Sequence, residues 1–337
     1  MDYQKLFFDF LKAHLPKEKI LVDELEKHLH VSKDGAYRRI GGRTALTLQE
    51  AMELAKALNL DFADFVGMAP GKMIFDHLSS GVKNGTDTAY PSYSDFVRQI
   101  SPRHITVLTS IIPAIHLCDF PDLYFFYQFF TEKTSLANPE LKDVDFSFDL
   151  PMKEKMLKGM EELQGYFFNT PTTEIFWIEA IDSLLKPIFY YHETDAFREK
   201  ETVSKLLRQM RLFIDNLEKM AAAGKKLRLD EDRDADRPHF ELYFTEVPLM
   251  ESTTIYTHDK GKFVVHRLNG LNLISTADTA YIRNIESLAE ILKDKSTNVT
   301  VGGEKTRLQF FNTMRRRLDL VRRKVESSHL ELSPVEA

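Results

Sequence analysis

The fold of the amino-terminal region is decided by residues 21–67, which read LVDELEKHLHVSKDGAYRRIGGRTALTLQEAMELAKALNLDFADFVG. Leucines recur at every fourth residue from Leu21 to Leu29 and give this stretch one apolar helical face. His30 follows, and histidine is among the non-glycine residues that tolerate left-handed backbone in a turn. Ser32 can then cap another helix by accepting a backbone N–H. The pattern predicts two short helices joined by a tight turn.

A capping box opens a further helix after the next loop. Thr47 and Glu50 stand three residues apart, the spacing at which each side chain can bond the backbone N–H of the other. The stripe that we expect this helix to bury comprises Leu48, Ala51, Ala55 and Leu58. Apolar residues at three- and four-residue spacing over 2–66 predict an all-α domain of five helices in total.

The helix that starts after Ser32 should turn a basic surface outward. Ala36 and Ile40 lie one turn apart and should face inward, which leaves Arg38 pointing away from the core. Residues 33–44 contain four basic residues and one acidic residue, although residues 1–68 contain ten basic and eleven acidic ones. Arginine donors match the edge of guanine or a phosphate, and a tyrosine hydroxyl can also contact phosphate. The candidate DNA-binding residues are therefore Ser32, Lys33, Asp34, Tyr37, Arg38, Arg39, Arg43 and Thr44.

This segment resembles the phage-repressor (Cro-like) helix-turn-helix family, in particular the form found in larger bacterial regulators. The matching residues are Leu29, Val31, Ser32, Asp34, Ala36, Tyr37, Arg38, Arg39, Ile40, Gly42, Leu46, Leu48, Glu50, Ala51, Leu54, Leu58 and Asn59. Two positions depart from the common form: Glu26 stands where a small alanine usually packs, and His30 replaces the usual turn glycine. Residues 111–130, 171–191 and 302–319 look like parts of one uncharacterised family of such regulators. The resemblance implies DNA-binding regulation and carries over no ligand.

The rest of the chain predicts a second, larger domain. We place the boundary near Met68, with a linker at 69–90 and an α+β effector or oligomerisation domain at 91–337. Its expected helices cover about 92–101, 121–135, 152–168, 173–189 and 195–222, with two closing helices at about 278–293 and 304–327. A mainly antiparallel sheet is expected from strands at 240–247, 253–257, 262–266 and 273–275, with a hairpin turn at 259–261.

Composition sets limits on the class of protein. The 337 residues, 43% of them hydrophobic, can bury at least one sizeable core. The longest apolar stretch, 105–117, is interrupted by polar residues and is shorter than the roughly 18 residues of a membrane span. The amino terminus lacks the features of a signal peptide. Because Cys118 is the only cysteine, no internal disulfide or cysteine-rich zinc site can form, and we expect a cytoplasmic protein without a membrane partner.

Patterns that suggest chemistry have simpler structural interpretations. The acidic run 230–236 with Glu241 follows calcium-loop spacing, but Ala235 stands where that loop requires glycine, so we expect a surface loop. His116 beside Cys118 and the His-Glu-Thr-Asp run at 192–195 have no partners at motif spacing. We therefore expect no metal, no cofactor and no enzyme activity.

Two further features leave alternatives open. Aromatic residues are dense between 120 and 191, and a fraction of this mostly buried cluster is a candidate lining for a small apolar effector. Residues 304–326 carry eight basic and three acidic residues. Apolar residues form a seam along this helix, which is either core or a dimer contact. The basic face is either solvated or a second DNA contact.

Together these patterns favour a sequence-specific transcriptional regulator that binds double-stranded DNA. We expect a homodimer on a two-fold operator, with half-sites about one helical turn apart. The alternative is a protein-interaction or oligomerisation module without DNA binding, which the nearly balanced charge of residues 1–68 would suit. Salt dependence separates the two hypotheses, because phosphate contacts weaken steeply as salt rises.

Overall fold

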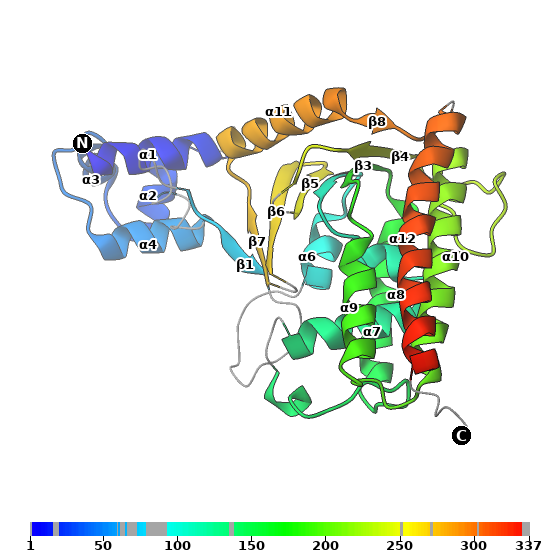
Figure 1. Cartoon of the computed structure of the whole chain (residues 1–337). Coiled ribbons are helices and arrows are strands. Elements are labelled where there is room, and N and C mark those ends of the chain that lie inside the picture. The colour runs from blue at the N-terminus through cyan, green and yellow to red at the C-terminus, as the bar shows by residue number, and fades with distance from the viewer. Residues whose placement is uncertain are drawn as a thin grey trace, which may run out of the picture. The chain divides into compact units, whose positions relative to one another are not determined.

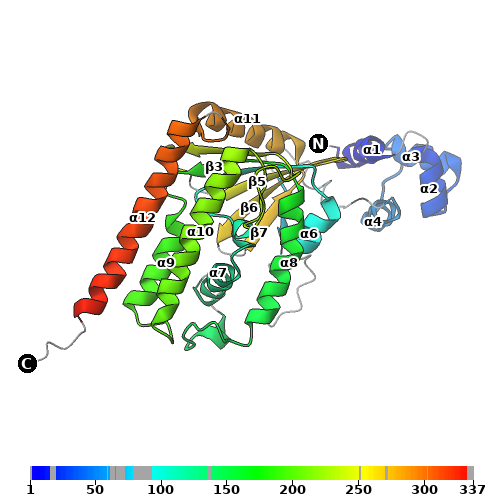
Figure 2. The same cartoon turned by 90° about the vertical axis from the view of Figure 1, so that its right-hand side faces the viewer.

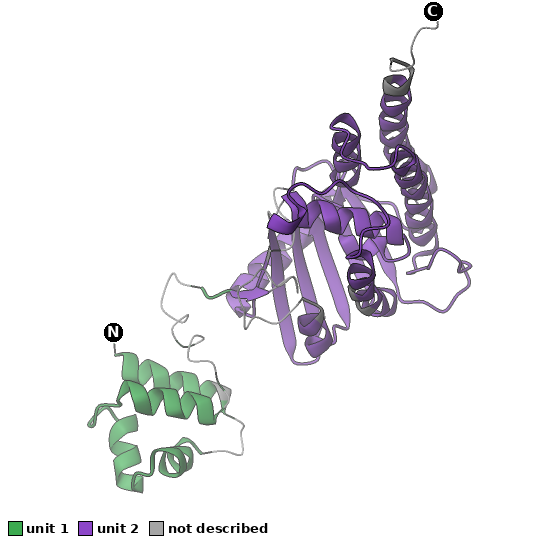
Figure 3. Ribbon diagram, turned by 90° about the horizontal axis from the view of Figure 1, so that it is seen from below, with its two compact units in different colours: residues 1–75 green, residues 76–337 purple. Residues whose placement is uncertain are grey.

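The computed structural model describes residues 2–15, 20–58, 60, 65, 73–78, 93–134, 138–249, 252–269, 272–301 and 303–331. The chain divides into two compact units, Met1–Phe75 and Asp76–Ala337 (Figure 3). In the described residues, unit 1 consists of helices, whereas unit 2 combines helices with one eight-stranded mixed sheet. The chain therefore has a multidomain organisation with an α+β second unit.

The described helices of unit 1 are α1 (Tyr3–His14), α2 (Leu21–Leu29), α3 (Lys33–Ile40) and α4 (Leu48–Ala57) (Figure 1). Their apolar faces share one core, in which Phe8, Leu11, Leu25, Ala36 and Leu54 are almost completely buried. Five helices were expected over residues 2–66; after α4, only residues 58, 60 and 65 of that range are among the described residues, so the fifth helix lies outside them.

The stripe expected on α4 is wrong at its first residue. Leu48 is 67% exposed, whereas Ala51, Leu54 and Ala55 are buried. The buried arc of the helix is thus centred on Ala51 and Leu54, and Leu48 lies at its edge, on the first turn. Met52, one turn after Leu48, is 55% exposed, so α4 presents two large apolar side chains on its surface.

The sheet of unit 2 has the strand order β1-β7-β6-β5-β2-β3-β4-β8. Strands β2, β3 and β4 are mutually parallel, and every other neighbouring pair is antiparallel. The strands are β1 (Asp76–Leu78), β2 (His104–Thr109), β3 (Thr172–Trp177), β4 (Phe240–Thr245), β5 (Ser252–His258), β6 (Gly261–Asn269), β7 (Asn272–Thr276) and β8 (Thr297–Asn298). Strand β1 lies within the expected linker and pairs with β7, while 79–90 lie outside the described residues.

The helix expected over 173–189 is wrong in its first part, because 172–177 form strand β3 and the helix begins only at Asp182. Two threonines open this strand and two aromatic residues close it, a composition that favours extended backbone. Strand β2 was not expected at all. Both strands have apolar neighbours on the two faces of the sheet, so they lack the alternation of polar and apolar residues that marks a half-exposed strand. They form the parallel centre of the sheet, which is therefore mixed.

The helical elements of unit 2 are α6 (Tyr93–Ile100), η1 (Ala114–Leu117), α7 (Pro121–Thr134), η2 (Pro139–Leu141), α8 (Lys153–Asn169), α9 (Asp182–Glu193), α10 (Glu201–Ala223), α11 (Thr279–Lys295) and α12 (Glu304–Glu331). Successive strand residues face opposite sides of the sheet. In β3, for example, Phe176 joins the core formed with α7, α9, α10 and α12, while Ile175 packs with α11 on the other face. Figure 2 shows α7, α9, α10 and α12 grouped together and α11 apart from α7, α9 and α10.

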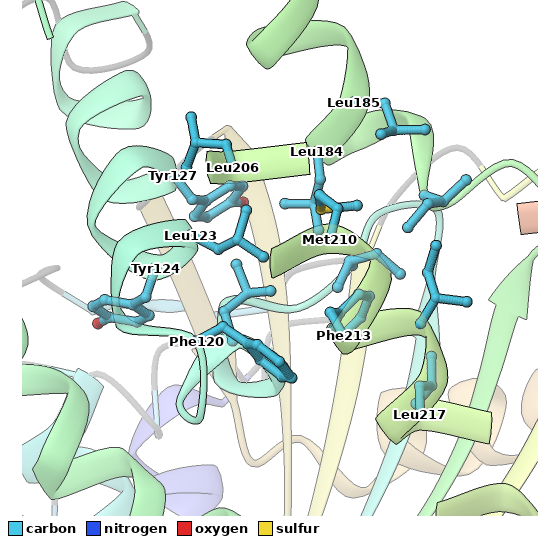
Figure 4. Close-up of a cluster of buried hydrophobic side chains, with 14 of the residues drawn as sticks. Phe120, Leu123, Tyr124, Tyr127, Leu184, Leu185, Leu206, Met210, Phe213 and Leu217 are labelled. Carbon is cyan, nitrogen blue, oxygen red and sulfur yellow. The ribbon is translucent and has the colours of Figure 1, made fainter. Parts of the chain in front are cut away.

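The aromatic residues between 120 and 191 mainly build the larger core. Figure 4 shows side chains of α7 meeting those of α10 in this core. Phe120, just before α7, stands edge-on to Phe213 of α10, with ring centroids 5.8 Å apart. Cys118 is also buried, and burial together with the nearby Asp119 raises the pKa of its thiol to about 12. The thiol is therefore protonated near neutral pH.

The apolar seam of α12 belongs to the core of unit 2. Phe311, Met314, Leu318 and Val325 are each at most 3% exposed and pack in the cluster that includes α9 and α10. The apolar seam is therefore buried within a single chain. Among the described residues, none of the helices combines the length and apolar character that a membrane span requires.

Candidate nucleic-acid interface

Helices α2 and α3 are joined by three residues with the backbone expected from the sequence. His30 adopts the left-handed conformation, with φ 53° and ψ 37°. The Ser32 hydroxyl accepts the backbone N–H of Gly35 at 3.2 Å and caps α3. Both predictions for this turn are confirmed, and so is the capping box of Thr47 and Glu50. These contacts fix where α3 begins.

The outward face of α3 carries a tyrosine and two basic side chains. Tyr37 is 58% exposed, and Lys33 and Arg38 are exposed as well. Arg38 donates from Nε to Asp34 Oδ2 at 2.7 Å, one turn earlier. The side chains of this pair are 57% and 68% exposed, so water screens their attraction strongly. An incoming phosphate or base edge can therefore replace Asp34 as the partner of Arg38 at little cost.

Arg39 differs from Arg38, because it faces α4. Its guanidinium lies 2.7 Å from Glu50 Oε1, and the two side chains are only 17% and 19% exposed. The other carboxylate oxygen, Oε2, accepts the N–H of Thr47 at 2.9 Å. Burial opposes ionisation of Glu50, but the bonds from Arg39 and Thr47 outweigh it and hold the pKa of Glu50 below its usual value. Arg39 thus ties α3 to the start of α4.

The loop after α3 is held by a residue that sequence analysis did not single out. Gln4 of α1 donates to the carbonyls of Arg39 and Thr44 at 2.7 and 2.8 Å. Its own carbonyl oxygen accepts the N–H of Leu46 at 2.9 Å. The exposed Arg43 lies on this loop, and its N–H donates to Arg38 O at 2.8 Å. Gln4 therefore fixes the backbone from which Arg43 projects.

The structure places most of the candidate residues on the surface of unit 1. Exposed side chains occur at Ser32, Lys33, Asp34, Tyr37, Arg38 and Arg43. Thr44 is half-buried, and Arg39 is engaged with Glu50. Residues 33–44 thus carry three exposed basic side chains, Lys33, Arg38 and Arg43, and one acidic side chain, Asp34. This local positive charge can attract an anionic polymer although the whole chain is acidic.

Unit 2 contains a buried charged cluster that could be mistaken for a catalytic site. Glu174 accepts from Lys226 Nζ at 3.0 Å and lies 2.6 Å from His116 Nε2. All three side chains are at most 1% exposed, so no substrate reaches them in this conformation. Burial alone would raise the pKa of Glu174. The neighbouring His116 and Lys226 lower this pKa by more than burial raises it, so the carboxylate stays ionised. The cluster joins β3, η1 and the segment after α10.

In the acidic run that follows calcium-loop spacing, Asp230, Asp232 and Asp234 are exposed, whereas two of the glutamates form internal bonds. Glu231 pairs with Arg237, and Glu241 of β4 accepts from Tyr243 and Lys293. No group of metal-ligating side chains occurs within the described part of the chain.

Comparison of the chain with protein-family models, with curated proteins and with solved structures finds no match. These comparisons therefore assign no family to the chain.

Proposed function

We propose that the protein is a DNA-binding transcriptional regulator whose residues 1–68 form a Cro-like helix-turn-helix domain, with α3 as the recognition helix. The observation that carries the proposal is the outward face of α3, where Lys33, Tyr37 and Arg38 are exposed on a helix fixed at both ends. A helix of this width fits the major groove, where arginine can bind guanine by two hydrogen bonds. Since its ligand would be chromosomal DNA, we propose the cytoplasm as its location.

Each candidate residue then has a distinct role. Arg38 would contact a base edge after leaving Asp34, while Lys33, Tyr37 and Arg43 would contact phosphates. Ser32 caps the helix, and the loop backbone at Thr44 is held by Gln4. Arg39 acts as a positioning residue, because its guanidinium is already bonded to Glu50. We further propose a homodimer that places two such helices on a two-fold operator, with half-sites roughly 34 Å apart.

The experiment that tests DNA binding starts with selection of bound sequences from a random double-stranded pool by the full-length protein. Affinity for the selected site is then measured across a salt series. Arg38→Ala should weaken binding to this site by about 1–3 kcal/mol and relax the preference at one position. Arg43→Ala should weaken binding to all sequences equally.

Lys12→Ala supplies the matched control, since it removes one exposed positive charge of unit 1 from α1 and leaves α3 unchanged. It should alter the affinity far less than Arg38→Ala. Selection that recovers no sequence, or affinity that does not fall as salt rises, would rule out the regulator proposal.

A second candidate function is a protein-interaction module, and exposed apolar residues on α4 favour it. Leu48 and Met52 are 67% and 55% exposed and lie one turn apart. Exposed apolar side chains that lie together often mark a protein contact. Under this alternative, Leu48→Ser would abolish binding of a protein partner, whereas Arg38→Ala would have no effect.

A further inference from the structure

A pocket of about 600 Å³ lies in unit 2 where the three parallel strands end. The pocket is lined by residues at the end of each parallel strand. These are Ser110 and Ile111 after β2, Trp177 at the end of β3, and Pro248 and Leu249 after β4. In open sheets, the loops at the carboxyl ends of parallel strands form the crevice in which ligands usually bind. The pocket therefore occupies a favourable position for a ligand site, and its volume suits a small organic molecule.

Three aromatic side chains contribute to the wall of this pocket. They come from separate elements: Phe130 from α7, Trp177 from β3 and Tyr190 from α9. Most aromatic residues of this part of the chain are buried in the core, but Tyr190 is 55% exposed and Phe130 and Trp177 are partly exposed. Aromatic faces bind flat apolar groups, and they also attract cations through the negative potential of the ring.

Two carboxylates line the same pocket. Glu179 and Asp182 have side chains that are 39% and 19% exposed, and both accept hydrogen bonds from Arg317 of α12, at 2.6 and 2.8 Å. These bonds use Glu179 Oε1 and Asp182 Oδ2. Within the described part of the chain, no hydrogen bond reaches the other oxygen of either carboxylate. The pair can therefore accept bonds from a second cationic group.

One further charge lines the pocket. Lys186 Nζ lies 3.5 Å from Asp182 Oδ2, but its side chain is 79% exposed. A pair with one partner so exposed adds little to the stability of the fold, because water screens it and the lysine chain remains free to move. The ammonium of Lys186 would nevertheless compete with a cationic ligand for Asp182. Of the charged side chains that line the pocket, the two carboxylates are thus the least exposed.

We propose that this pocket binds an organic cation with a flat apolar body. The aromatic side chains would contact the body, and Glu179 and Asp182 would accept charge-assisted hydrogen bonds from its amidinium, guanidinium or ammonium group. The pair already binds one planar cation, the guanidinium of Arg317. The sequence suggested an apolar effector, and the carboxylates add the requirement for positive charge. That the ligand acts as an effector rests on the proposed regulatory function, whereas binding itself does not.

The test uses Trp177 as an internal probe, since it is the only tryptophan of the chain. The full-length protein is titrated with a biphenyl amidine and, separately, with the neutral biphenyl carboxamide of the same shape. The amidine should change the tryptophan fluorescence in a saturable manner and bind at least about tenfold more tightly than the carboxamide, because only the amidine can form charge-assisted bonds. Equal affinity for the two probes would overturn the proposal.

Two substitutions should shift the amidine affinity in opposite directions. Glu179→Gln should weaken amidine binding about tenfold and leave carboxamide binding unchanged. Lys186→Met should strengthen amidine binding severalfold, because it removes a nearby positive charge from an exposed site where the fold does not depend on it. An unchanged amidine affinity in folded Lys186→Met protein counts against the proposal even if Glu179→Gln fails to fold.

DNA binding measured on the same samples separates this proposal from the proposed function. Protein that binds its selected DNA but shows no saturable response to the amidine disproves the ligand site alone. Protein that binds the amidine with the expected charge dependence but binds no DNA supports the ligand site and removes its regulatory interpretation.

Discussion

Two consecutive arginines of α3 lie in different environments. Arg38 and its partner Asp34 are 57% and 68% exposed, whereas Arg39 and Glu50 are 17% and 19% exposed. Solvent screens the first pair, and the second pair is partly shielded and shares the hydrogen bonds of the α4 cap. Arg39 is therefore expected to support the stability of unit 1, and Arg38 is expected to serve binding.

Replacing each arginine with alanine should separate the two roles. Arg39→Ala should lower the free energy of unfolding by about 1–2 kcal/mol, because it leaves Glu50 without its main partner. Arg38→Ala should lower it by less than about 0.5 kcal/mol. Urea unfolding of both variants and of the parent protein, followed by circular dichroism, measures the difference. Equal losses in the two variants would contradict this assignment.

Glu50 also predicts a pH dependence. Its folded-state pKa is lowered, so its stabilising contribution is present above the unfolded pKa of about 4.3 and is lost as pH falls through the folded value. Glu50→Gln removes the titrating group. The difference in unfolding free energy between parent and variant should be constant near neutral pH and shrink below about pH 4. A difference that does not change in acid would show that ionisation of Glu50 contributes nothing to stability.

Residues whose roles are local could be predicted from the sequence, and residues whose partners are distant could not. The cap at Ser32 and the left-handed His30 depend on neighbours within three residues. Gln4 binds the backbone of residues 35 and 40 positions away, so its role appears only when α1 packs beside the loop. The bond of Arg39 to Glu50, 11 positions away, also depends on tertiary packing.

At the scale of the element, the cap of α3 offers a test that distinguishes folding from binding. Ser32→Ala should destabilise unit 1 by about 1 kcal/mol, because the N–H of Gly35 loses its acceptor. Ser32→Asp should keep the cap and the stability but weaken DNA binding, since a carboxylate would stand close to phosphates. Ser32→Asn, which caps without a charge, is the control. Melting temperatures and DNA affinities of the three variants decide the point.

Strands were harder to predict than helices in the parallel part of the sheet. Strands β4 to β7 follow one another with short connections, and their alternating pattern was visible in the sequence. Strands β2 and β3 are separated by two α-helices and two short 3-10 helices, and both have apolar neighbours on the two faces of the sheet, so they show no alternation. The pocket at their carboxyl ends could not be predicted, because it depends on where these two strands lie.

At the scale of the whole molecule, unit 2 depends on the buried cluster of Glu174, Lys226 and His116. Glu174→Gln should destabilise the protein by about 3–5 kcal/mol, because it leaves the ammonium of Lys226 buried without its counter-charge. Combining Glu174→Gln with Lys226→Met should recover much of this loss, since no buried charge then lacks a partner. Thermal unfolding of the two variants tests this cycle. A double variant less stable than Glu174→Gln would argue against the pairing.

The division into two units also limits what sequence patterns reveal. The pattern that suggested a helix-turn-helix occupies one short segment, residues 21–67, and its described residues lie within unit 1. The larger unit is assembled from segments far apart in the chain, with β3 of the middle paired to β2 before it and β4 after it. Local periodicity therefore describes its pieces better than their order in the sheet.

Cys118, buried and protonated near neutral pH, gives the protein a practical property. A thiol in that state reacts slowly with maleimides and other alkylating reagents, which attack through the thiolate. The folded native protein should therefore react very slowly with such reagents. A cysteine introduced at Lys33 would be the first reactive thiol, and a photoactivatable cross-linker attached there would record which molecules approach α3.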